Sequence, residues 1–355
     1  MEQLKVLELF AGIGACSKAL TNLGIPHKIV DAVEIDKYAI KSFNAIHGTN
    51  FPPQDITKWD KDIKVDLIMH GSPCQDFSVA GKGAGGDKGS GTRSSLMYET
   101  IRIVDKLRPK YVLWENVKNL LSEKHRPNYF AYIKAMTNMG YKSFGRVLNA
   151  KDFGVPQNRE RIYTLSIRVD DDPQFGFPEP FKLERRLKDV LEDKVDEKYY
   201  LSDEQVEKFK NSTFNQYRTR IQEGDVSQTI LARDWKDPKC VRVGGLYDRP
   251  GHKHQAGSVW HTEGLVGTLS TMQGGNQEPI IMDEYTPESR VRKLTPRECW
   301  RLMGFDDEAF DRAKATGMSD TQLYKQAGNS IVVNVLMAIF ERLFYGEPTG
   351  QSTDE

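Results

Sequence analysis

Short apolar runs alternate with amphipathic stretches through the first half of the chain. Runs such as Lys5–Phe10 and Val65–His70 are typical of buried strands, whereas stretches such as Lys37–His47 are typical of amphipathic helices. This β-α-β-α order predicts an α/β fold with a mostly parallel, doubly wound sheet of Rossmann-like type. The other predicted helices are Ala15–Leu23, Ser94–Leu107 and Tyr129–Met139, and the other predicted strands are Lys28–Glu34, Tyr111–Glu115, Lys142–Leu148 and Ile162–Ile167.

The pattern changes after Asp170. Pro- and Asp-containing segments at 171–173 and 177–180 indicate a linker, and short strand-like pieces with Gly and Pro punctuation follow between Leu201 and Met282. Thr295-Pro296-Arg297-Glu298 has the form of a capping box with proline at the first helical position, and Ile331–Phe344 is a strongly apolar final helix. We therefore predict a main domain over residues 1–175, completed by 290–345, and a smaller irregular β-rich domain over 176–289. The polar tail 346–355 is predicted to be disordered.

Composition narrows the class of protein only a little. Of the 355 residues, 38% are hydrophobic and 28% charged, and no run of about eighteen apolar residues indicates a membrane span. The first residues do not have the pattern of a signal peptide, so we expect a cytoplasmic protein without a membrane partner. Lys+Arg and Asp+Glu both number 50, which gives a formal net charge of zero. This balance argues mildly against a nucleic-acid binder, although a basic cleft is compatible with acidic outer faces.

The four cysteines are Cys16, Cys74, Cys240 and Cys299, and they are far apart in the sequence. They form no CxxC pair, so neither a zinc site nor a disulfide framework is predicted. No metal-ligand cluster is found elsewhere, and we expect no metal cofactor.

A glycine-containing turn follows the first predicted strand, at Leu9–Gly14. Glycines at a strand–helix turn let a ligand approach the backbone at a helix N-terminus. Glu34 ends the next strand, twenty residues after Gly14, where a carboxylate can bind ribose hydroxyls. Ser17 stands where a dinucleotide fingerprint has its third glycine, which weakens that interpretation. By itself the turn is compatible with an ordinary connection, an NAD site or an S-adenosylmethionine site.

The third predicted strand is followed by Gly71-Ser72-Pro73-Cys74-Gln75. A lone cysteine is more often a buried structural residue than a nucleophile. Here three features favour the nucleophile: the strand end, the restriction imposed by Pro73, and the glycine-rich segment 81–93. That segment is either a disordered connector or a lid over the cysteine, and its basic residues, which suit phosphates, favour the lid. These basic residues are Lys82, Lys88 and Arg93.

Three further motifs carry polar residues next to predicted elements. Glu115 ends a buried strand, where its pKa would be raised, although a carboxylate capping the next turn is equally compatible. Arg159 and Arg161 lie two residues apart and share one face of an extended chain, where they suit a phosphate, an anionic intermediate or simply solvent. Asn329 or Ser330 is predicted to cap the last helix, which leaves room for a role at a ligand.

Together, these motifs occur in the order of one family, and the chain resembles the C5-cytosine methyltransferases of bacterial and phage modification systems. The likeness covers roughly residues 4–170 and 290–345, and Pro73-Cys74-Gln75, followed by Glu115-Asn116-Val117, is its most specific part. The uncovered part, about 175–289, falls where this family has its target recognition domain. The other matching motifs are Phe10–Gly14, Glu34, Asp55-Ile56, Gln157-x-Arg159-x-Arg161, Arg292–Glu298, Gly328-Asn329-Ser330 and, in the uncovered part, Val266–Ser270 with its Thr-Leu core.

The resemblance implies transfer of a methyl group from S-adenosylmethionine to C5 of a cytosine flipped out of duplex DNA. It implies a catalytic role for Cys74, Glu115, Arg159 and Arg161. The partner would be double-stranded DNA, the protein would be a monomer, and a cognate restriction endonuclease could act on the same site. The cofactor residues implied are Phe10, Ala11, Gly12, Gly14, Glu34, Ile35, Asp55, Ile56, Pro73, Asn329 and Ser330, and the DNA-binding residues are Gln75, Ser78, Lys82, Arg93, Thr268 and Leu269.

Three other functions compete with this one. A tRNA cytosine-5 methyltransferase would share the catalytic core, but the long stretch 175–289 favours reading of a DNA site. An inactive DNA-binding regulator on the same fold would have no need of Cys74, Glu115 and Arg161 together. An NAD enzyme leaves the cysteine and glutamate motifs unexplained.

Overall fold

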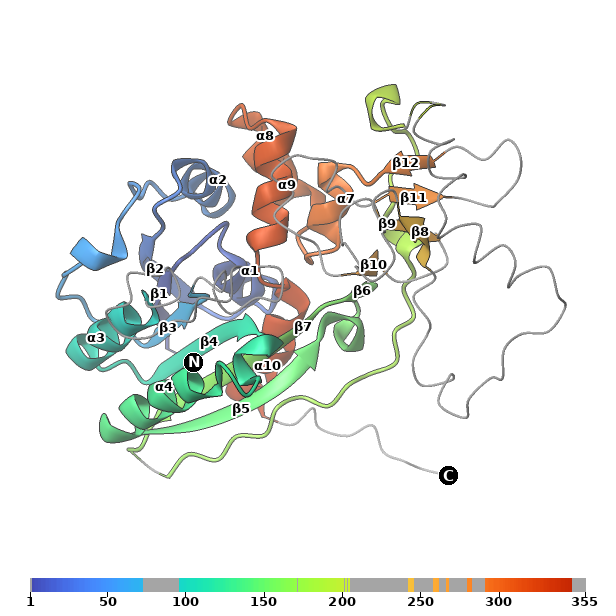
Figure 1. The fold of residues 1–355 in the computed structure, drawn as a ribbon. Helices are drawn as coiled ribbons and strands as arrows, with labels where there is room; N and C mark the ends of the chain where they lie inside the picture. Colours follow the sequence, from blue (N-terminus) through green and yellow to red (C-terminus); the bar gives the residue numbers. More distant parts are fainter. Residues whose placement is uncertain are drawn as a thin grey trace, which may run out of the picture.

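A six-stranded mixed sheet forms the centre of the protein (Figure 1). The computed structural model describes residues 2–72, 96–170, 172–200, 202, 204, 242–245, 258–261, 266–267, 280–282 and 291–346. The strand order is β2-β1-β3-β4-β7-β5, with parallel pairing from β2 to β4 and antiparallel pairing of β7 with β4 and β5. The predicted mostly parallel sheet is therefore confirmed. Its strands are β1 (Leu4–Leu9), β2 (His27–Val33), β3 (Leu67–His70), β4 (Tyr111–Val117), β5 (Tyr141–Asn149) and β7 (Glu160–Arg168).

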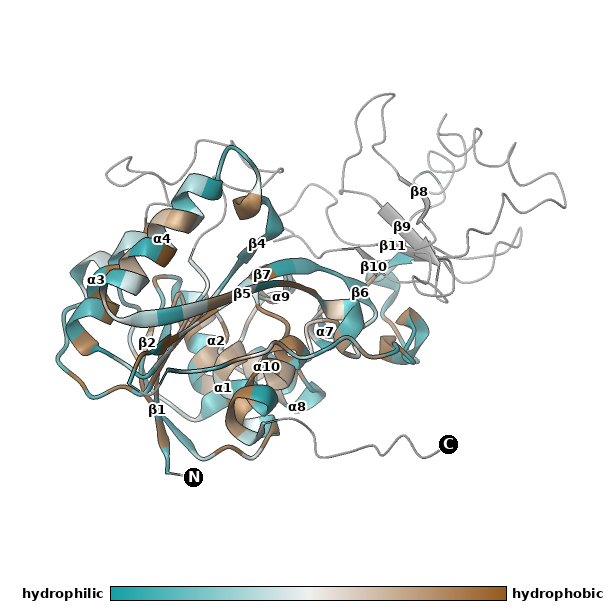
Figure 2. Cartoon of the chain, turned by 90° about the horizontal axis from the view of Figure 1, so that it is seen from below, coloured by the Kyte–Doolittle hydropathy of each residue, from teal (hydrophilic) through white to brown (hydrophobic). Residues whose placement is uncertain are grey.

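Helices cover both faces of this sheet, as Figure 2 shows. Side chains that alternate along each strand enter two separate cores. On β4, Leu113 packs in the core formed with α1 (Ala15–Asn22) and α10 (Val333–Tyr345). Its neighbour Trp114 packs in the opposite core, formed with α3 (Met97–Leu107) and α4 (Arg126–Asn138). This alternation decides which residues of β4 and β3 meet at the sheet edge.

The chain after residue 295 forms three helices, α7, α8 and α9, followed by α10. α7 (Pro296–Arg301) begins at the predicted capping box, in which Thr295 accepts from the backbone N–H of Glu298. α8 (Asp307–Ala315) packs against α2 (Lys37–His47), and α9 (Asp320–Asn329) precedes α10. The stretch Asp320–Tyr345 has the length and apolar composition of a membrane span. It consists of two helices separated by residues 330–332, and α10 uses its apolar side chains in the core: Val333, Leu336, Ile339 and Phe340.

A second sheet has the order β12-β11-β9-β8 and lies at the other end of the molecule (Figure 1). A separate two-residue strand, β10 (Val266–Gly267), pairs in parallel with β6 (Gln157–Asn158). β10, which lies between β9 and β11 in the sequence, therefore contacts the two residues directly before Arg159. The strands of the second sheet are β8 (Arg242–Gly245), β9 (Ser258–His261), β11 (Ile280–Met282) and β12 (Val291–Lys293).

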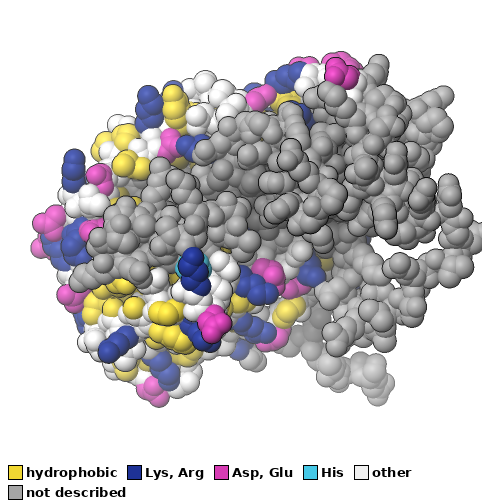
Figure 3. Space-filling model, in the orientation of Figure 1, with side chains coloured by type: hydrophobic (Ala, Val, Ile, Leu, Met, Phe, Trp, Pro, Cys, Tyr) yellow, Lys and Arg dark blue, Asp and Glu magenta, His cyan; other side chains and the backbone are white. Residues whose placement is uncertain are grey.

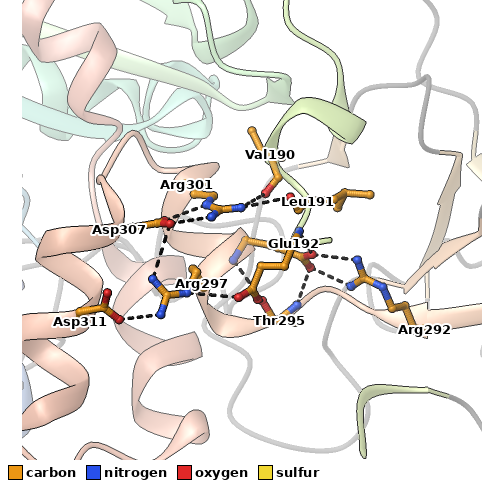
Figure 4. A network of polar contacts seen from close by, with 10 residues as sticks. Val190, Leu191, Glu192, Arg292, Thr295, Arg297, Arg301, Asp307 and Asp311 are labelled. Atoms are coloured by element: carbon orange, nitrogen blue, oxygen red, sulfur yellow. Dashed lines mark hydrogen bonds and ion pairs between the residues drawn. The ribbon is translucent and has the colours of Figure 1, made fainter. Parts of the chain in front are cut away.

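A network of charged residues connects β12 to α7 and α8 (Figure 4). Arg292 binds the buried carboxylate of Glu298 through two nitrogens, at 2.8 and 2.9 Å. The backbone N–H of Glu192 also donates to Glu298, at 2.8 Å, and Arg301 donates to the carbonyls of Val190 and Leu191. The network therefore holds the chain just before residue 200 against the chain just after residue 290.

Charge is mixed over the described part of the surface. Figure 3 shows Lys and Arg side chains interspersed with Asp and Glu side chains on the face that it presents. Ion pairs such as Lys118–Glu160 at 3.0 Å and Arg146–Glu179 at 2.7 Å account for part of this balance. Opposite charges are thus placed side by side on this face.

Candidate active site

The carboxyl ends of β1, β2, β3 and β4 meet at one edge of the main sheet, because these strands are parallel. β7 runs in the opposite direction, so its first residues lie at the same edge, where Val117 is paired with Arg161. Polar residues that are far apart in the sequence come together here: Glu34, Ser72, Glu115 and Arg161. These described residues therefore lie along one edge of the sheet.

Glu115 and Arg161 form an ion pair at this edge. Arg161 Nε lies 3.1 Å from Glu115 Oε1, and the two side chains are 15% and 11% exposed. Burial raises the pKa of the Glu115 carboxyl above its usual value, and the nearby guanidinium groups of Arg161 and Arg159 act in the opposite direction. A raised pKa favours the protonated form of a carboxyl, which can donate its proton to a ligand.

Arg159 is buried, with 4% of its surface exposed. Its Nη2 donates to the carbonyl oxygens of Gly328, at 3.2 Å, and Ser330, at 2.9 Å. The side chain therefore contacts the junction between α9 and α10, whereas among the described residues Arg161 forms the ion pair with Glu115. Both guanidinium groups nevertheless lie near enough to Glu115 to lower the pKa of its carboxyl.

Asn329 and Ser330 do not cap the last helix, contrary to the prediction. Asn329 is the last residue of α9, Ser330 is its C-cap, and α10 begins after Val332, which provides no side-chain cap. The prediction was wrong because α9 had not been recognised as a separate helix ending at this motif. The next residue, Ile331, packs beside Gly71, where an added Cβ would lie 3.4 Å from Ile331 and 3.5 Å from Glu115 Oε2.

The glycine turn after β1 adopts a backbone that side chains disfavour. Gly12 and Gly14 have φ values of 57° and 82°. A Cβ on Gly14 would lie 2.1 Å from the ring of His47, so this glycine allows α1 to approach α2. A Cβ on Gly12 would meet nothing within 4 Å, which leaves space in front of the turn. Gly14 therefore permits close packing of α1 against α2, whereas Gly12 leaves room for a ligand in front of the turn.

Glu34 connects this turn to the end of β2. Its carboxylate accepts from the backbone N–H of Gly12, at 2.9 Å, and from that of Asp36, at 2.8 Å. Burial raises its pKa. The next side chain, Ile35, is 71% exposed and gives an apolar surface beside the carboxylate. A carboxylate, an open glycine turn and an apolar side chain fit the ribose and base of a nucleoside.

Asp55 and Ile56 lie at the start of a short helical turn, η1 (Ile56–Lys58). Asp55 caps this turn by accepting from the backbone N–H and the hydroxyl of Thr57, at 3.0 and 2.8 Å. The side chain of Ile56 is 5% exposed and packs in the core with Trp59. Of the two, only Asp55 has a side chain that a ligand could reach. Phe10 and Ala11, by contrast, are both half-buried in the turn itself.

Several predicted site residues lie outside the described residues. These are Pro73, Cys74, Gln75, Ser78, Lys82 and Arg93 after β3, and Thr268 and Leu269 after β10. The described chain reaches Ser72 on one side and Gly267 on the other.

Sequence reasoning missed the contacts of Ser72. Its hydroxyl accepts from the indole N–H of Trp114, at 3.0 Å, and its carbonyl oxygen accepts from the side-chain amide of Asn116, at 3.3 Å. Ser17, which was read only as a missing glycine, donates through its backbone N–H to the buried Glu8 at 3.1 Å. The sequence shows Trp114 beside Glu115 at the end of a strand, which indicates an indole N–H near the site. Only the fold shows that this N–H binds Ser72.

Among the cysteines, Cys16 and Cys299 are buried. Within the described ranges no group of three or more His, Cys, Asp or Glu residues is arranged to hold a metal ion.

The sequence model of the C-5 cytosine-specific DNA methylases matches residues 4–345. The chain belongs to this family. It is 33% identical to the orphan methyltransferase M.SPBetaI of Bacillus phage SPbeta, over 97% of this chain and 98% of that protein. It is 35% identical to the type II methyltransferase M.HhaI of Haemophilus parahaemolyticus, over 95% of this chain and 93% of that protein.

Solved structures have the same fold. The Dnmt2 methyltransferase of S. pombe is 20% identical and superposes with a TM-score of 0.67, over 97% of this chain and 99% of the other. As a C-5 cytosine DNA methylase, the chain is a DNA cytosine-5 methyltransferase that uses S-adenosylmethionine and acts on DNA. Its phage and bacterial relatives fit a role in DNA modification, and the tRNA and regulator alternatives are not favoured.

Proposed function

We propose that Cys74 is the nucleophile and Glu115 the acid of this methyltransferase. The Cys74 thiolate forms a bond to C6 of cytosine, the C5–C6 electron pair moves into the C4–C5 bond, and the displaced C4–N3 pair takes a proton at N3 from Glu115. This makes C5 an enamine carbon and hence a nucleophile. After C5 has taken the methyl group, solvent takes up the C5 proton, the C5–H electron pair re-forms the C5–C6 double bond, and Cys74 leaves as a thiolate. N3 returns its proton to Glu115, which restores the aromatic ring and the acid. The observation that carries the proposal is the buried Glu115 carboxyl with a raised pKa at the strand edge beside Gly71.

Arg161 supports this acid chemistry. Its guanidinium contacts Glu115 and is 15% exposed, so it is placed to stabilise charge that develops near O2 of the base. Arg159 contributes through its charge and by holding the carbonyls of Gly328 and Ser330. We therefore assign Arg161 to direct contact with the base and Arg159 to positioning.

The cofactor site is proposed at the glycine turn. S-adenosylmethionine, when bound, supplies an electrophilic methyl group. The space in front of Gly12, the Glu34 carboxylate and the exposed Ile35 side chain would hold its nucleoside, with Asp55 near the base. The remaining contacts that we propose come from Phe10, Ala11, Gly14, the backbone of Ile56, Pro73, Asn329 and Ser330.

For DNA we propose binding by the segment after Cys74 and by the domain at 176–289. Gln75, Ser78, Lys82 and Arg93 would contact the flipped nucleotide and its phosphates, and Thr268 and Leu269 would follow the β6–β10 pair towards the base edges. We further propose a cytoplasmic monomer made of a main domain over 1–175 with 290–345, together with this recognition domain. A restriction endonuclease acting on the same site is a proposed partner.

Bisulfite sequencing of plasmid DNA from cells that express the chain tests this assignment. The expected result is one protected cytosine context, absent with Cys74→Ala and retained with the matched control Cys299→Ala, because Cys299 is buried in α7. Protection that persists with Cys74→Ala would contradict the nucleophile. A lack of protection with the unaltered chain, together with methylated tRNA, would contradict DNA as the substrate.

A further inference from the structure

The inference concerns Ser72, two residues before Cys74, and it rests on the proposed function of Cys74 and Glu115. Ser72 is 4% exposed and is the last described residue before the cysteine. Among the described residues, its hydrogen-bond donors are the two residues of β4 on either side of Glu115, and the amide of Asn116 reaches both the carbonyl oxygen, at 3.3 Å, and the hydroxyl, at 3.5 Å. The nucleophile segment and the acid are therefore connected through one strand.

Alternation along β4 explains this arrangement. Glu115 lies on the face of the sheet that carries Leu113, towards Gly71 and Ile331. Trp114 and Asn116 point to the opposite face, and there they donate to the hydroxyl and the carbonyl oxygen of Ser72. Gly71 thus faces the Glu115 carboxylate, and Ser72 is hydrogen-bonded to the residues on either side of Glu115. The segment after β3 therefore cannot slide along β4 without breaking these hydrogen bonds.

The ring of Trp114 is itself fixed. It is 1% exposed and stacks on His70, with ring centroids 5.7 Å apart and an interplanar angle of 7°. Its ring also contacts the ring of Tyr132, with the two ring centroids 4.2 Å apart. Tyr132 and His70 are joined at 3.2 Å between the hydroxyl and Nε2, and burial lowers the pKa of His70 to about 3, so this histidine is neutral. The indole N–H is therefore aimed at Ser72 by a packed aromatic cluster.

We propose that the Trp114–Ser72 hydrogen bond is a positioning contact that sets Cys74 in register with Glu115 for attack on the base. Such a contact acts on the geometry of the reaction and leaves the bound cofactor untouched. Misplacement of reacting groups by about 1 Å can slow an enzyme by up to about 10²-fold. Loss of this one hydrogen bond should therefore reduce turnover by about tenfold and leave the affinity for S-adenosylmethionine unchanged.

The test uses Trp114→Phe, Ser72→Ala and the double variant in the full-length protein. Single-turnover methyl transfer to duplex DNA that carries the methylated context is measured, together with KM for DNA and the affinity for S-adenosylmethionine. We expect the single-turnover rate constant to fall by about tenfold in each single variant, with KM within about twofold. The double variant should be no slower than the slower single variant, because both remove the same hydrogen bond.

Trp300→Phe is the matched control. Trp300 is fully buried in α7, and its indole N–H donates to the carbonyl oxygen of Leu323, at 2.9 Å. This variant removes a comparable hydrogen bond away from the sheet edge and should keep the rate of the unaltered protein per folded molecule. If it slows the reaction as much as Trp114→Phe, general loss of packing explains the effect and the proposal is overturned.

The pH profile separates positioning from a direct effect on the acid. Ser72→Ala should lower the rate at all pH values and leave the alkaline limb, set by Glu115, where it is. Wild-type rates in Ser72→Ala and Trp114→Phe, or losses that multiply in the double variant, would overturn the inference and leave the proposed function standing. Absence of methyl transfer by the unaltered protein would instead overturn the proposed function.

Discussion

Two glutamate–arginine pairs in this chain have the same side chains and different surroundings. The carboxylate of Glu298 is fully buried and accepts four hydrogen bonds, two from Arg292 and one each from the backbone N–H groups of Thr295 and Glu192 (Figure 4). The carboxylate of Glu115 is 11% exposed and, among the residues that the structure describes, is paired with Arg161 alone. The Glu298 carboxylate thus has donors on both of its oxygens, whereas Oε2 of the Glu115 carboxylate faces Gly71.

This difference separates a structural carboxylate from a reactive one. A carboxylate with all of its acceptor sites filled has no capacity left for a substrate proton, and it holds the segments that donate to it. A buried carboxyl with one ion-pair partner and a raised pKa can exchange a proton with a ligand. Both pairs belong to motifs that resemble the family pattern, so the motif alone does not distinguish these purposes.

The largest effect is expected at Glu115. Glu115→Gln keeps the size of the side chain but removes the acidic proton, so methyl transfer should slow by about 10²–10⁴-fold. The rate is measured in a single turnover with saturating S-adenosylmethionine. Thermal unfolding serves as the control and should show a protein at least as stable as the original, because a buried ionisable group has been replaced. A near-normal rate would remove Glu115 from the mechanism.

At the other pair the expected effect is on stability. Arg292→Met leaves the Glu298 carboxylate buried without its cation, which should lower the free energy of unfolding by about 3–5 kcal/mol. Urea denaturation measures this change. The control is Lys118→Met, which breaks the exposed pair with Glu160 and should cost no more than about 1 kcal/mol. Equal losses in both variants would contradict the structural assignment of Glu298.

A third buried carboxylate, Glu8, has Ser17 as its partner instead of a cation. Burial raises its pKa to about 7 from 4.5. The unfolded chain ionises first, so the stabilising contribution is complete below pH 4.5 and is lost as the pH rises to about 7. At about 1.4 kcal/mol per pKa unit, the loss amounts to about 3 kcal/mol. Glu8→Gln should flatten the stability curve across this window, as measured by urea denaturation at several pH values. An unchanged slope would contradict the assignment.

The smallest effect is a shift in pH dependence. The Arg161 guanidinium lowers the pKa of Glu115, so Arg161→Met should raise that pKa further. Glu115 would then keep its proton to higher pH. The alkaline limb of the pH–rate profile should therefore shift to higher pH, while the maximal rate falls. An alkaline limb that shifts to lower pH, or does not shift, would show that the Glu115–Arg161 ion pair does not set the pKa of the catalytic acid.

Much of the main sheet could be predicted from the sequence, because buried strands and amphipathic helices have distinct periodicities. The capping box at Thr295 located the start of α7 for the same local reason. The pattern did not reveal that α9 ends at Asn329, because the polar residues between Asp320 and Asn329 obscure the boundary with the apolar α10. The capping prediction for Asn329 and Ser330 failed on that boundary.

The site was predictable as a set of residue types, but its contacts were not. The spacing of Arg159 and Arg161 indicated one shared face, and both guanidinium groups act on Glu115. The spacing did not indicate that Arg159 also reaches the carbonyl of Ser330, 171 positions further along the chain. The Trp114–Ser72 hydrogen bond likewise joins β4 to the segment that follows β3, and the pairing of these strands depends on the whole sheet. Such contacts are set by strand order and register, which local sequence patterns do not encode.

The most direct test of the central claim is covalent trapping with duplex DNA that carries 5-fluorocytosine at the methylated position. Fluorine at C5 cannot leave as a proton, so the protein should remain bound to the base after methyl transfer. Peptide mass spectrometry of the adduct should place the modified nucleotide on Cys74 in the unaltered chain, and much less adduct should form with Glu115→Gln. An adduct on Cys16, Cys240 or Cys299, or methyl transfer to unmodified DNA without any adduct, would contradict the account.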